Sequence, residues 1–147
     1  MPHPQLQTAI ALHRSGRLAE AEQLYREVLR HEPNEAQALH LLGLIADQTG
    51  RRGEAEGLVE RAISLRPSAD FFNSLGLIRE GMGNSAGAES CYRRALSFDP
   101  GFVKALNNLG GVLQARGDFV AAERTYRQAT TLAPQAPSAL NNLGTVL

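Results

Sequence analysis

Apolar side chains recur along the chain at the spacing of one helix face, and no stretch alternates between apolar and polar residues. In residues 36–49 they include Leu39, Leu42 and Ala46, three and four positions apart, as on one side of an α-helix. The pattern therefore predicts helices and no strands. The expected helices span about residues 4–15, 18–31, 36–49, 52–65, 69–82, 85–98, 102–116, 119–132 and 136–147.

Two kinds of residue that end helices keep one period along the chain. Four of the glycines are spaced 34, 33 and 34 residues apart, and four of the prolines have the same spacing. The glycines are Gly16, Gly50, Gly83 and Gly117, and the prolines are Pro33, Pro67, Pro100 and Pro134. Glycine closes a helix because it adopts left-handed dihedrals without steric cost, and the residue before a proline is disfavoured in helical dihedrals. The period predicts a solenoid of stacked units with two helices each.

Small residues recur inside the expected helices at the same period. The first helices carry Gly43, Gly76, Gly110 and Gly144, and the second helices carry Ala21, Ala55, Ala88 and Ala122. Because glycine inside a helix costs about 1 kcal/mol relative to alanine, we expect a neighbouring backbone to lie against each of these glycines. One turn beyond the alanines stand Tyr25, Val59, Tyr92 and Tyr126. We expect them to fill the core, with the hydroxyl groups at its rim.

These registers together resemble one known repeat. In the fourth cycle they are Leu109, Gly110, Gly117, Ala122, Tyr126, Ala129 and Pro134. This arrangement looks like the tetratricopeptide repeat, and the resemblance covers residues 2–147. The first cycle departs from it, because Thr8 and Ala9 replace the Leu-Gly pair.

The expected fold is all-α, a right-handed α-solenoid or superhelix of tetratricopeptide-type helix pairs. A single repeat domain is expected over residues 2–147. Its repeats would span about residues 2–35, 36–68, 69–102 and 103–136, followed by a lone first helix at 137–147.

Composition narrows the classes of partner. The chain has 147 residues, of which 43% are hydrophobic and 20% charged, with 15 basic and 15 acidic side chains. Nucleic-acid and anionic-membrane binders carry a basic excess, so neither partner is expected. Without an apolar run of about 18 residues, no membrane insertion is expected either. Cys91 is the only cysteine, which excludes an intramolecular disulfide and fits a reducing compartment such as the cytoplasm.

Residue types that perform catalysis do not form a recognisable set. Metal sites on a helix use pairs of histidines about one turn apart. The histidines His3, His13, His31 and His40 include no pair spaced by three or four residues. No serine lies in a nucleophile elbow, and the glycines are too dispersed for a phosphate loop. We expect no catalytic residue, no metal and no cofactor, and therefore no enzymatic activity.

A stack of helix pairs offers a long surface rather than a pocket, which favours binding. The resemblance to tetratricopeptide proteins implies that the first helix of each pair lines a concave groove. The residues expected to line it are Asp47, Gln48, Asn73, Leu77, Glu80, Asn107, Asn108, Gly111, Gln114, Asn141, Asn142 and Thr145. The sequence therefore predicts a non-catalytic scaffold that binds protein or peptide partners in this groove.

Paired asparagines at positions 107–108 and 141–142 need an explanation, because asparagine is a poor helix former. An amide group offers both a donor and an acceptor, so a row of amides can hold a peptide backbone without reading its side chains. Alternatively, one asparagine of each pair bonds a neighbouring helix and stabilises the stack. The sequence leaves both interpretations open.

The segment Ala-Leu-Asn-Asn-Leu-Gly occurs at residues 105–110 and again at 139–144. It is similar to the repeats of O-linked N-acetylglucosamine transferases and their bacterial relatives. This resemblance implies an alternative function, the substrate-selecting repeat region of a glycosyltransferase whose catalytic domain lies outside this sequence. The carboxylate clamp of chaperone-cofactor repeats has a single counterpart, Lys104, so recognition of acidic chaperone tails is not expected.

The last residues repeat only the first helix of a further cycle. Its apolar residues are Leu140, Leu143, Val146 and Leu147, and no second helix follows in this sequence to cover them. Exposed apolar surface favours self-association. A homo-oligomer formed through the C-terminal helix is therefore a third possibility.

Overall fold

The computed structural model describes residues 3–146, except for the side chains of residues 137–140. This part of the chain is all-α and contains nine helices, whose bounds differ from the predicted ones by at most one residue. They are α1 (Pro4–Arg14), α2 (Leu18–His31), α3 (Ala36–Gln48), α4 (Arg52–Leu65), α5 (Ala69–Gly81), α6 (Ser85–Phe98), α7 (Val103–Ala115), α8 (Phe119–Leu132) and α9 (Pro137–Val146). The predicted fold class is confirmed.

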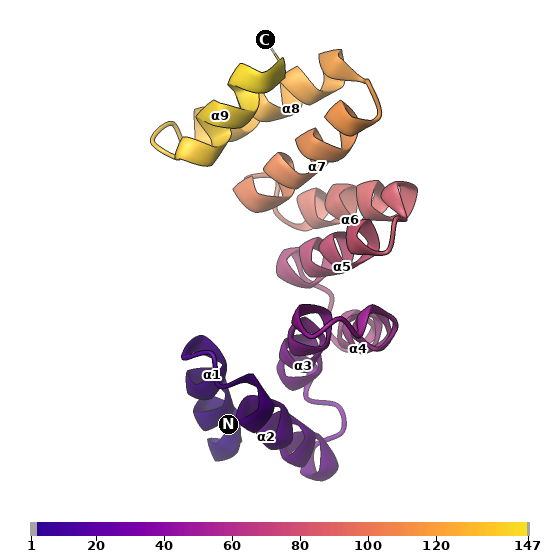
Figure 1. Ribbon diagram of the computed structural model, residues 1–147, viewed down its shortest axis with the longest axis vertical. Coiled ribbons are helices and arrows are strands. Elements are labelled where there is room, and N and C mark those ends of the chain that lie inside the picture. Colours follow the sequence, from indigo (N-terminus) through magenta and orange to yellow (C-terminus); the bar gives the residue numbers. More distant parts are fainter. Residues whose placement is uncertain (1–2, 147) are drawn as a thin grey trace. The chain divides into compact units, whose positions relative to one another are not determined.

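The helices form two compact units, Met1–Pro67 with α1–α4 and Ser68–Leu147 with α5–α9. In the first unit, α1 packs on α2, α2 on α3, and α3 on α4. In the second unit, each helix likewise packs on the next, and α7 also contacts both α5 and α9 (Figure 1). The first helices of successive pairs in the second unit therefore lie next to one another.

The first helix of each complete pair ends at a glycine, as predicted. Gly16, Gly50, Gly83 and Gly117 have φ between 80° and 88°, a region that favours glycine. At the end of α7, the amide of Asp118 donates to the carbonyl of Leu113 at 2.9 Å and the amide of Gly117 to that of Gln114 at 3.0 Å. These bonds satisfy helix-terminal carbonyl groups that would otherwise have no partner.

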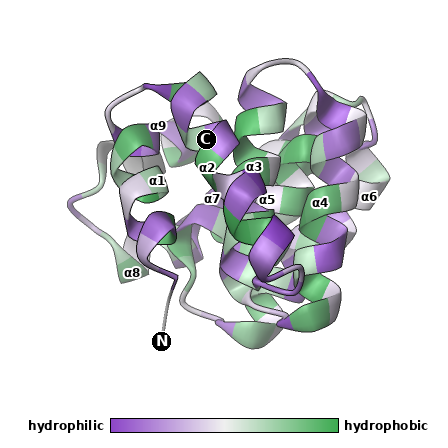
Figure 2. Cartoon of the chain, turned by 90° about the horizontal axis from the view of Figure 1, so that it is seen from below, coloured by the Kyte–Doolittle hydropathy of each residue, from purple (hydrophilic) through white to green (hydrophobic). Residues whose placement is uncertain are grey.

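The core lies within the helix pairs and between successive pairs, since one buried cluster contains residues of α1, α2 and α3 and another contains residues of α6, α7 and α8. Each helix accordingly has a hydrophobic and a hydrophilic side (Figure 2). Tyr25 and Tyr92 are completely buried and Tyr126 is 2% exposed. A β-carbon at Gly76 would lie 2.7 Å from Cδ1 of Tyr92, and one at Gly110 would lie 2.6 Å from Cδ1 of Tyr126. The in-helix glycines therefore make room for these rings.

This contact corrects one detail of the prediction. The neighbour of Gly76 and Gly110 is an aromatic side chain of the paired helix, not its backbone. At Gly43 the nearest atom to an added β-carbon is Cγ2 of Val59 at 2.7 Å, with the carbonyl oxygen of Ala55 at 3.3 Å. Gly144 has open space above it, so the predicted close contact is absent there.

The tyrosine hydroxyls lie at the rim of the core, as predicted, and each bonds a residue twelve positions earlier. The Tyr92 hydroxyl donates to Oε1 of Glu80 at 2.5 Å and the Tyr126 hydroxyl to Oε1 of Gln114 at 3.1 Å. Burial raises the pKa of Tyr25 to about 12. Burial, with the hydrogen bond and charge of Glu80, holds the pKa of Tyr92 far above its usual value. The hydroxyls of Tyr92 and Tyr126 are donors in these bonds, because a carboxylate oxygen and an amide oxygen accept.

Ion pairs connect neighbouring repeats at the second helices. Arg26 of α2 pairs with Glu54 of α4 at 2.8 Å, and in the second unit Arg116 pairs with Glu89 of α6. Hydrogen bonds from Arg93 and from Arg116 hold the pKa of Glu89 below its usual value, although burial acts in the opposite direction. Glu54 and Glu89 thus connect neighbouring repeats. None of the helices in residues 3–146 has the length and apolar character that a membrane span requires.

Candidate functional site

A hollow of about 390 Å³ opens on the side of the second unit formed by its first helices. Five of the predicted groove residues line it together with Lys104. Asn73 and Leu77 come from α5, Asn107 and Asn108 from α7, and Asn142 from α9. We call it the amide hollow, because four of its six lining side chains are asparagines.

Helix periodicity explains why these side chains meet. Leu75 and Ile78 of α5 and Leu109 and Val112 of α7 are at most 6% exposed, so they turn one side of each helix into the core. The residues of the amide hollow occupy another side, at positions 73 and 77 on α5 and at 104, 107 and 108 on α7. Residues three or four apart are neighbours on a helix surface. Contacts of α7 with α5 and α9 then bring the three surfaces together.

In the asparagine pair 107–108, one asparagine bonds a neighbouring helix, which confirms the packing interpretation for this pair. Nδ2 of Asn108 donates to Oδ1 of Asn73 across the α5–α7 contact at 2.9 Å, and Asn73 is only 4% exposed. This hydrogen bond connects two consecutive repeats. Asn73 and Asn108 therefore contribute to the packing of the stack as well as to the lining of the hollow.

Asn107 behaves differently from its neighbour in the sequence. Its Oδ1 is buried and has no hydrogen-bond partner in the described part of the chain. A buried acceptor that stays unsatisfied costs about 1–3 kcal/mol. Asn107 is at the same time one of the residues that line the amide hollow.

The remaining polar character of the amide hollow comes from Lys104, which is exposed and is the one cation among the lining residues. Leu77 adds an apolar surface and is 46% exposed. The groove predicted from the sequence does not include Lys104. Its place in the hollow follows from its spacing, since it stands three and four residues before the two asparagines on the same helix.

The other predicted groove residues lie outside the amide hollow. Glu80 and Gln114 accept the tyrosine bonds described above, and Nε2 of Gln114 donates to Oγ1 of Thr145 at 3.3 Å. Gly111 and Asn141 are exposed on α7 and α9 without lining the hollow.

Asp47 and Gln48 belong to α3, in the first unit. Asp47 pairs with Arg52 at 3.3 Å, and Oε1 of Gln48 lies 3.3 Å from Nε2 of His13. The same histidine is hydrogen-bonded through Nδ1 to the Tyr25 hydroxyl at 3.2 Å. Gln48, His13 and Tyr25 thus form a hydrogen-bonded chain within the first unit, and the Asp47–Arg52 ion pair belongs to the same unit.

The histidine and cysteine side chains that the sequence offered for catalysis or metal binding include two that are buried within helices. His40 is 4% exposed within α3, and Cys91 is 3% exposed within α6, where its sulfur accepts a hydrogen bond from Nη1 of Arg79 at 3.3 Å. Among the described residues, no three histidine, cysteine or carboxylate side chains come together in a way that could hold a metal ion.

The sequence pattern of the tetratricopeptide repeat family matches residues 6–70, 73–137 and 111–147. The chain therefore belongs to the tetratricopeptide repeat family, which agrees with its paired helices and with the registers of glycine, alanine, tyrosine and proline. No curated protein sequence matches the chain.

Solved structures of several repeat proteins are similar to this one. A crystal structure of MamA has a TM-score of 0.83 and 21% identity, over 97% of this chain and 78% of MamA. YrrB, described as a repeat protein with an unusual peptide-binding site, has a TM-score of 0.79 and 22% identity, over 97% and 74% of the two chains. The first repeat domain of Spaghetti, bound to the HSP90 peptide SRMEEVD, has a TM-score of 0.73 and 20% identity, over 76% and 90%. At these identities the likeness establishes the fold.

Proposed function

We propose that the chain is a non-catalytic scaffold that binds extended segments of partner polypeptides in the amide hollow. The observation that carries this proposal is the convergence of asparagines from α5, α7 and α9 around the buried, unpartnered Oδ1 of Asn107. A peptide backbone presents N–H donors and carbonyl acceptors in alternation, and an asparagine side chain matches both. Asn107 and Asn142 bring two such side chains to the amide hollow.

The hollow favours recognition of the backbone over that of particular side chains. Asn73 and Asn108 are already bonded to each other, which holds the amide of Asn108 in place. Leu77 offers one apolar contact, and Lys104 offers one charge that suits a carboxylate. Such a site tolerates many sequences and prefers partners with an acidic group near the bound segment.

The comparisons support the class of ligand. YrrB is described as having a peptide-binding site, and the Spaghetti domain is bound to a peptide. Tetratricopeptide repeats generally mediate interactions between proteins. The proposal places the corresponding surface of this chain on its first helices, where the lining is amide-rich.

A pair of alanine substitutions tests the amide hollow. We expect Asn107→Ala with Asn142→Ala to weaken the binding of unstructured peptides about tenfold, since each hydrogen bond contributes about 0.5–1.5 kcal/mol. The peptides are selected first from an array on the unmodified protein, and their affinities are then measured by fluorescence anisotropy. Asn141→Ala is the matched control, because Asn141 is exposed on α9 and does not line the hollow. Equal affinities for the parent and the double variant would contradict the proposal.

A finer version of this function is that the repeats select substrates for a glycosyltransferase. It rests on the Ala-Leu-Asn-Asn-Leu-Gly resemblance, and the similar structures named above lend it no specific support. The sequence that follows residue 147 in the gene tests it directly. A glycosyltransferase domain there would support this version, and its absence would leave the general scaffold as the proposal.

We also propose that the chain self-associates near its C-terminal helix, through residues other than those expected from the sequence. Leu143 and Val146 of α9 are partly buried against the core of α7 and α8, whereas Leu147 and the side chain of Leu140 lie outside the described residues. Phe119 and Val120 are two adjacent large apolar side chains that remain exposed, at 56% and 72%, at the start of α8. Adjacent exposed apolar groups of this size favour contact with another protein surface.

We expect Phe119→Ser with Val120→Ser to lower self-association in sedimentation velocity over a range of concentrations. The Asn107→Ala, Asn142→Ala variant serves as the comparison, because it alters a different surface of the same unit. A parent chain that stays monomeric at every concentration would exclude self-association and leave the amide hollow untouched.

A further inference from the structure

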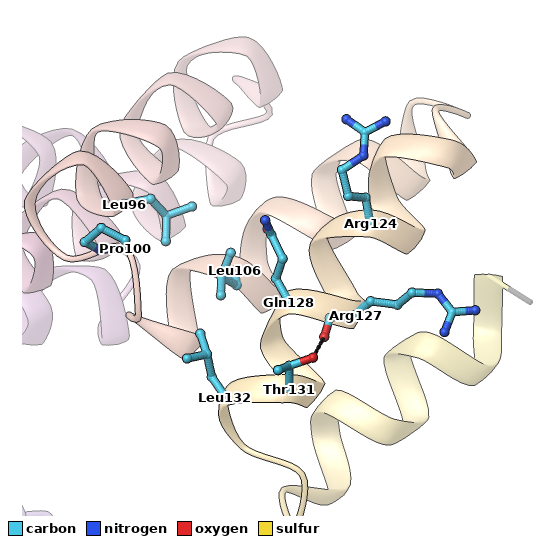
Figure 3. Close-up of a pocket in the computed structure, with 8 residues that line it drawn as sticks. All are labelled: Leu96, Pro100, Leu106, Arg124, Arg127, Gln128, Thr131 and Leu132. Atoms are coloured by element: carbon cyan, nitrogen blue, oxygen red, sulfur yellow. Dashed lines mark hydrogen bonds between the residues drawn. The ribbon is translucent and has the colours of Figure 1, made fainter.

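A different kind of hollow lies between successive second helices. In the second unit it runs between α6 and α8, with α7 beneath, and has a volume of about 610 Å³. Leu96, Pro100, Leu106 and Leu132 form its apolar lining. Figure 3 shows the three leucines on one side of α8, while the side chains of Arg124 and Arg127 point away from them, Arg127 toward α9. We call this hollow the outer groove.

The first unit contains the equivalent groove, between α2 and α4 with α3 beneath, with a volume of about 770 Å³. Leu29, Leu39 and Arg61 line it at positions two repeats before Leu96, Leu106 and Gln128 of the outer groove. The same registers thus produce a groove in each unit independently. The groove is therefore a property of the repeat and not an irregularity of one loop.

Part of the apolar lining of the outer groove is accessible. Leu106 forms its floor and is 4% exposed, whereas Leu132 at the end of α8 is 52% exposed. Leu65 and Phe98 occupy the register of Leu132 in earlier repeats and are 40% and 46% exposed. An apolar side chain at this register is thus 40–52% exposed in three consecutive repeats. In the outer groove, a leucine-sized group placed over Leu106 and Leu132 would cover the exposed part of Leu132.

The rim of the outer groove is cationic. Its lining contains Arg124 and Arg127 and no carboxylate. Arg127 pairs with Glu123 at 2.8 Å, whereas no ion pair of Arg124 occurs among the described residues. In the first unit the lining carries three arginines but also Glu27, so the outer groove of the second unit is the stronger site for an anion.

We propose that the outer groove binds a short acidic, leucine-bearing segment of a partner protein. Leucine-type side chains of this segment lie over Leu106 and Leu132, and a carboxylate of the segment pairs with Arg124. Charge complementarity selects this partner, because an apolar segment with lysines would bring like charges beside Arg124 and Arg127. The site is separate from the amide hollow, which is lined by other residues of α5, α7 and α9.

The probe for this proposal is a short fluorescent peptide of leucine and glutamate residues, compared with a second peptide in which lysine replaces each glutamate. We expect the glutamate peptide to bind and the lysine peptide not to bind. Arg124→Glu should weaken binding about tenfold or more, because it replaces an attraction by a repulsion. Leu132→Ser should weaken it as well, and both residues are exposed, so neither variant threatens the fold.

The charge-matched control is Arg17→Glu, at an exposed position before α2 in the first unit, which should leave the affinity unchanged. The proposal is overturned if the glutamate peptide does not bind, if the lysine peptide binds as well, or if Arg124→Glu and Leu132→Ser retain the parent affinity. It is also overturned if Asn107→Ala with Asn142→Ala abolishes binding while Arg124→Glu does not, because the peptide then occupies the amide hollow.

Discussion

Replacement of Gly110 by valine is expected to lower the free energy of unfolding by about 1–3 kcal/mol or more, the usual effect of overpacking a well-packed core. A β-carbon at this position would lie 2.6 Å from Cδ1 of Tyr126, which is closer than two carbon atoms that are not bonded to each other can approach. The ring has little room to move, because it is 2% exposed and packs in a cluster with Ala88, Tyr92 and Leu109. Urea denaturation followed by circular dichroism measures the effect.

The adjacent Gly111 supplies a matched control. A β-carbon there would meet only the hydroxyl oxygen of Tyr126, at 3.7 Å, an ordinary contact. Gly111→Ala should therefore raise the free energy of unfolding by about 0.5–1 kcal/mol, the gain expected from removing a glycine inside a helix. Gly110→Ala should lower it, although both changes have the same intrinsic effect on helix formation. A Gly110→Val protein with the urea midpoint of the parent would refute the ring contact.

Removal of the Tyr92 side chain is the second change with a large expected effect. Tyr92 is completely buried, and truncating a buried aromatic residue to alanine typically costs about 3–5 kcal/mol. We expect Tyr92→Ala to lose that much stability, since the ring fills the space that Gly76 leaves open. The measurement is again urea denaturation, with the slope of the transition checked against the parent.

Tyr92→Phe separates packing from hydrogen bonding. Phenylalanine keeps the ring and loses only the bond from the hydroxyl to Glu80. Because Glu80 is exposed, water can replace the lost donor, and the expected cost is about 0.5–1.5 kcal/mol. If Tyr92→Phe were as destabilising as Tyr92→Ala, the hydrogen bond and not the ring would dominate at this site.

The second unit offers two surfaces of different chemistry. The amide hollow presents paired donors and acceptors with one cation, and the outer groove presents leucines beside arginines. A backbone-directed site and a charge-directed site would suit different segments of one partner or two partners. Substitutions at Asn107 and Asn142 on one side, and at Arg124 and Leu132 on the other, separate the two in a single set of binding measurements.

The sequence by itself determined the secondary structure of this protein and much of its core. The helices begin and end within a residue of the predicted positions, because glycine and proline act through local backbone dihedrals that need no tertiary context. The burial of Tyr25, Tyr92 and Tyr126 also followed from their register, since each occupies one position of a repeated helix pair. The amide hollow was predicted in part, because first helices of successive repeats place equivalent residues on one surface.

Only the tertiary structure decided which groups touch. The repeat places Asn73, Asn107 and Asn108 on one side of the stack, but the distances between α5 and α7 make Asn108 a donor to Asn73 and leave the oxygen of Asn107 without a partner. Packing likewise made a tyrosine ring, and not a backbone, the neighbour of Gly110. The outer groove forms where side chains from three helices do not fill the space between them. The sequence pattern of a single helix does not predict such a groove.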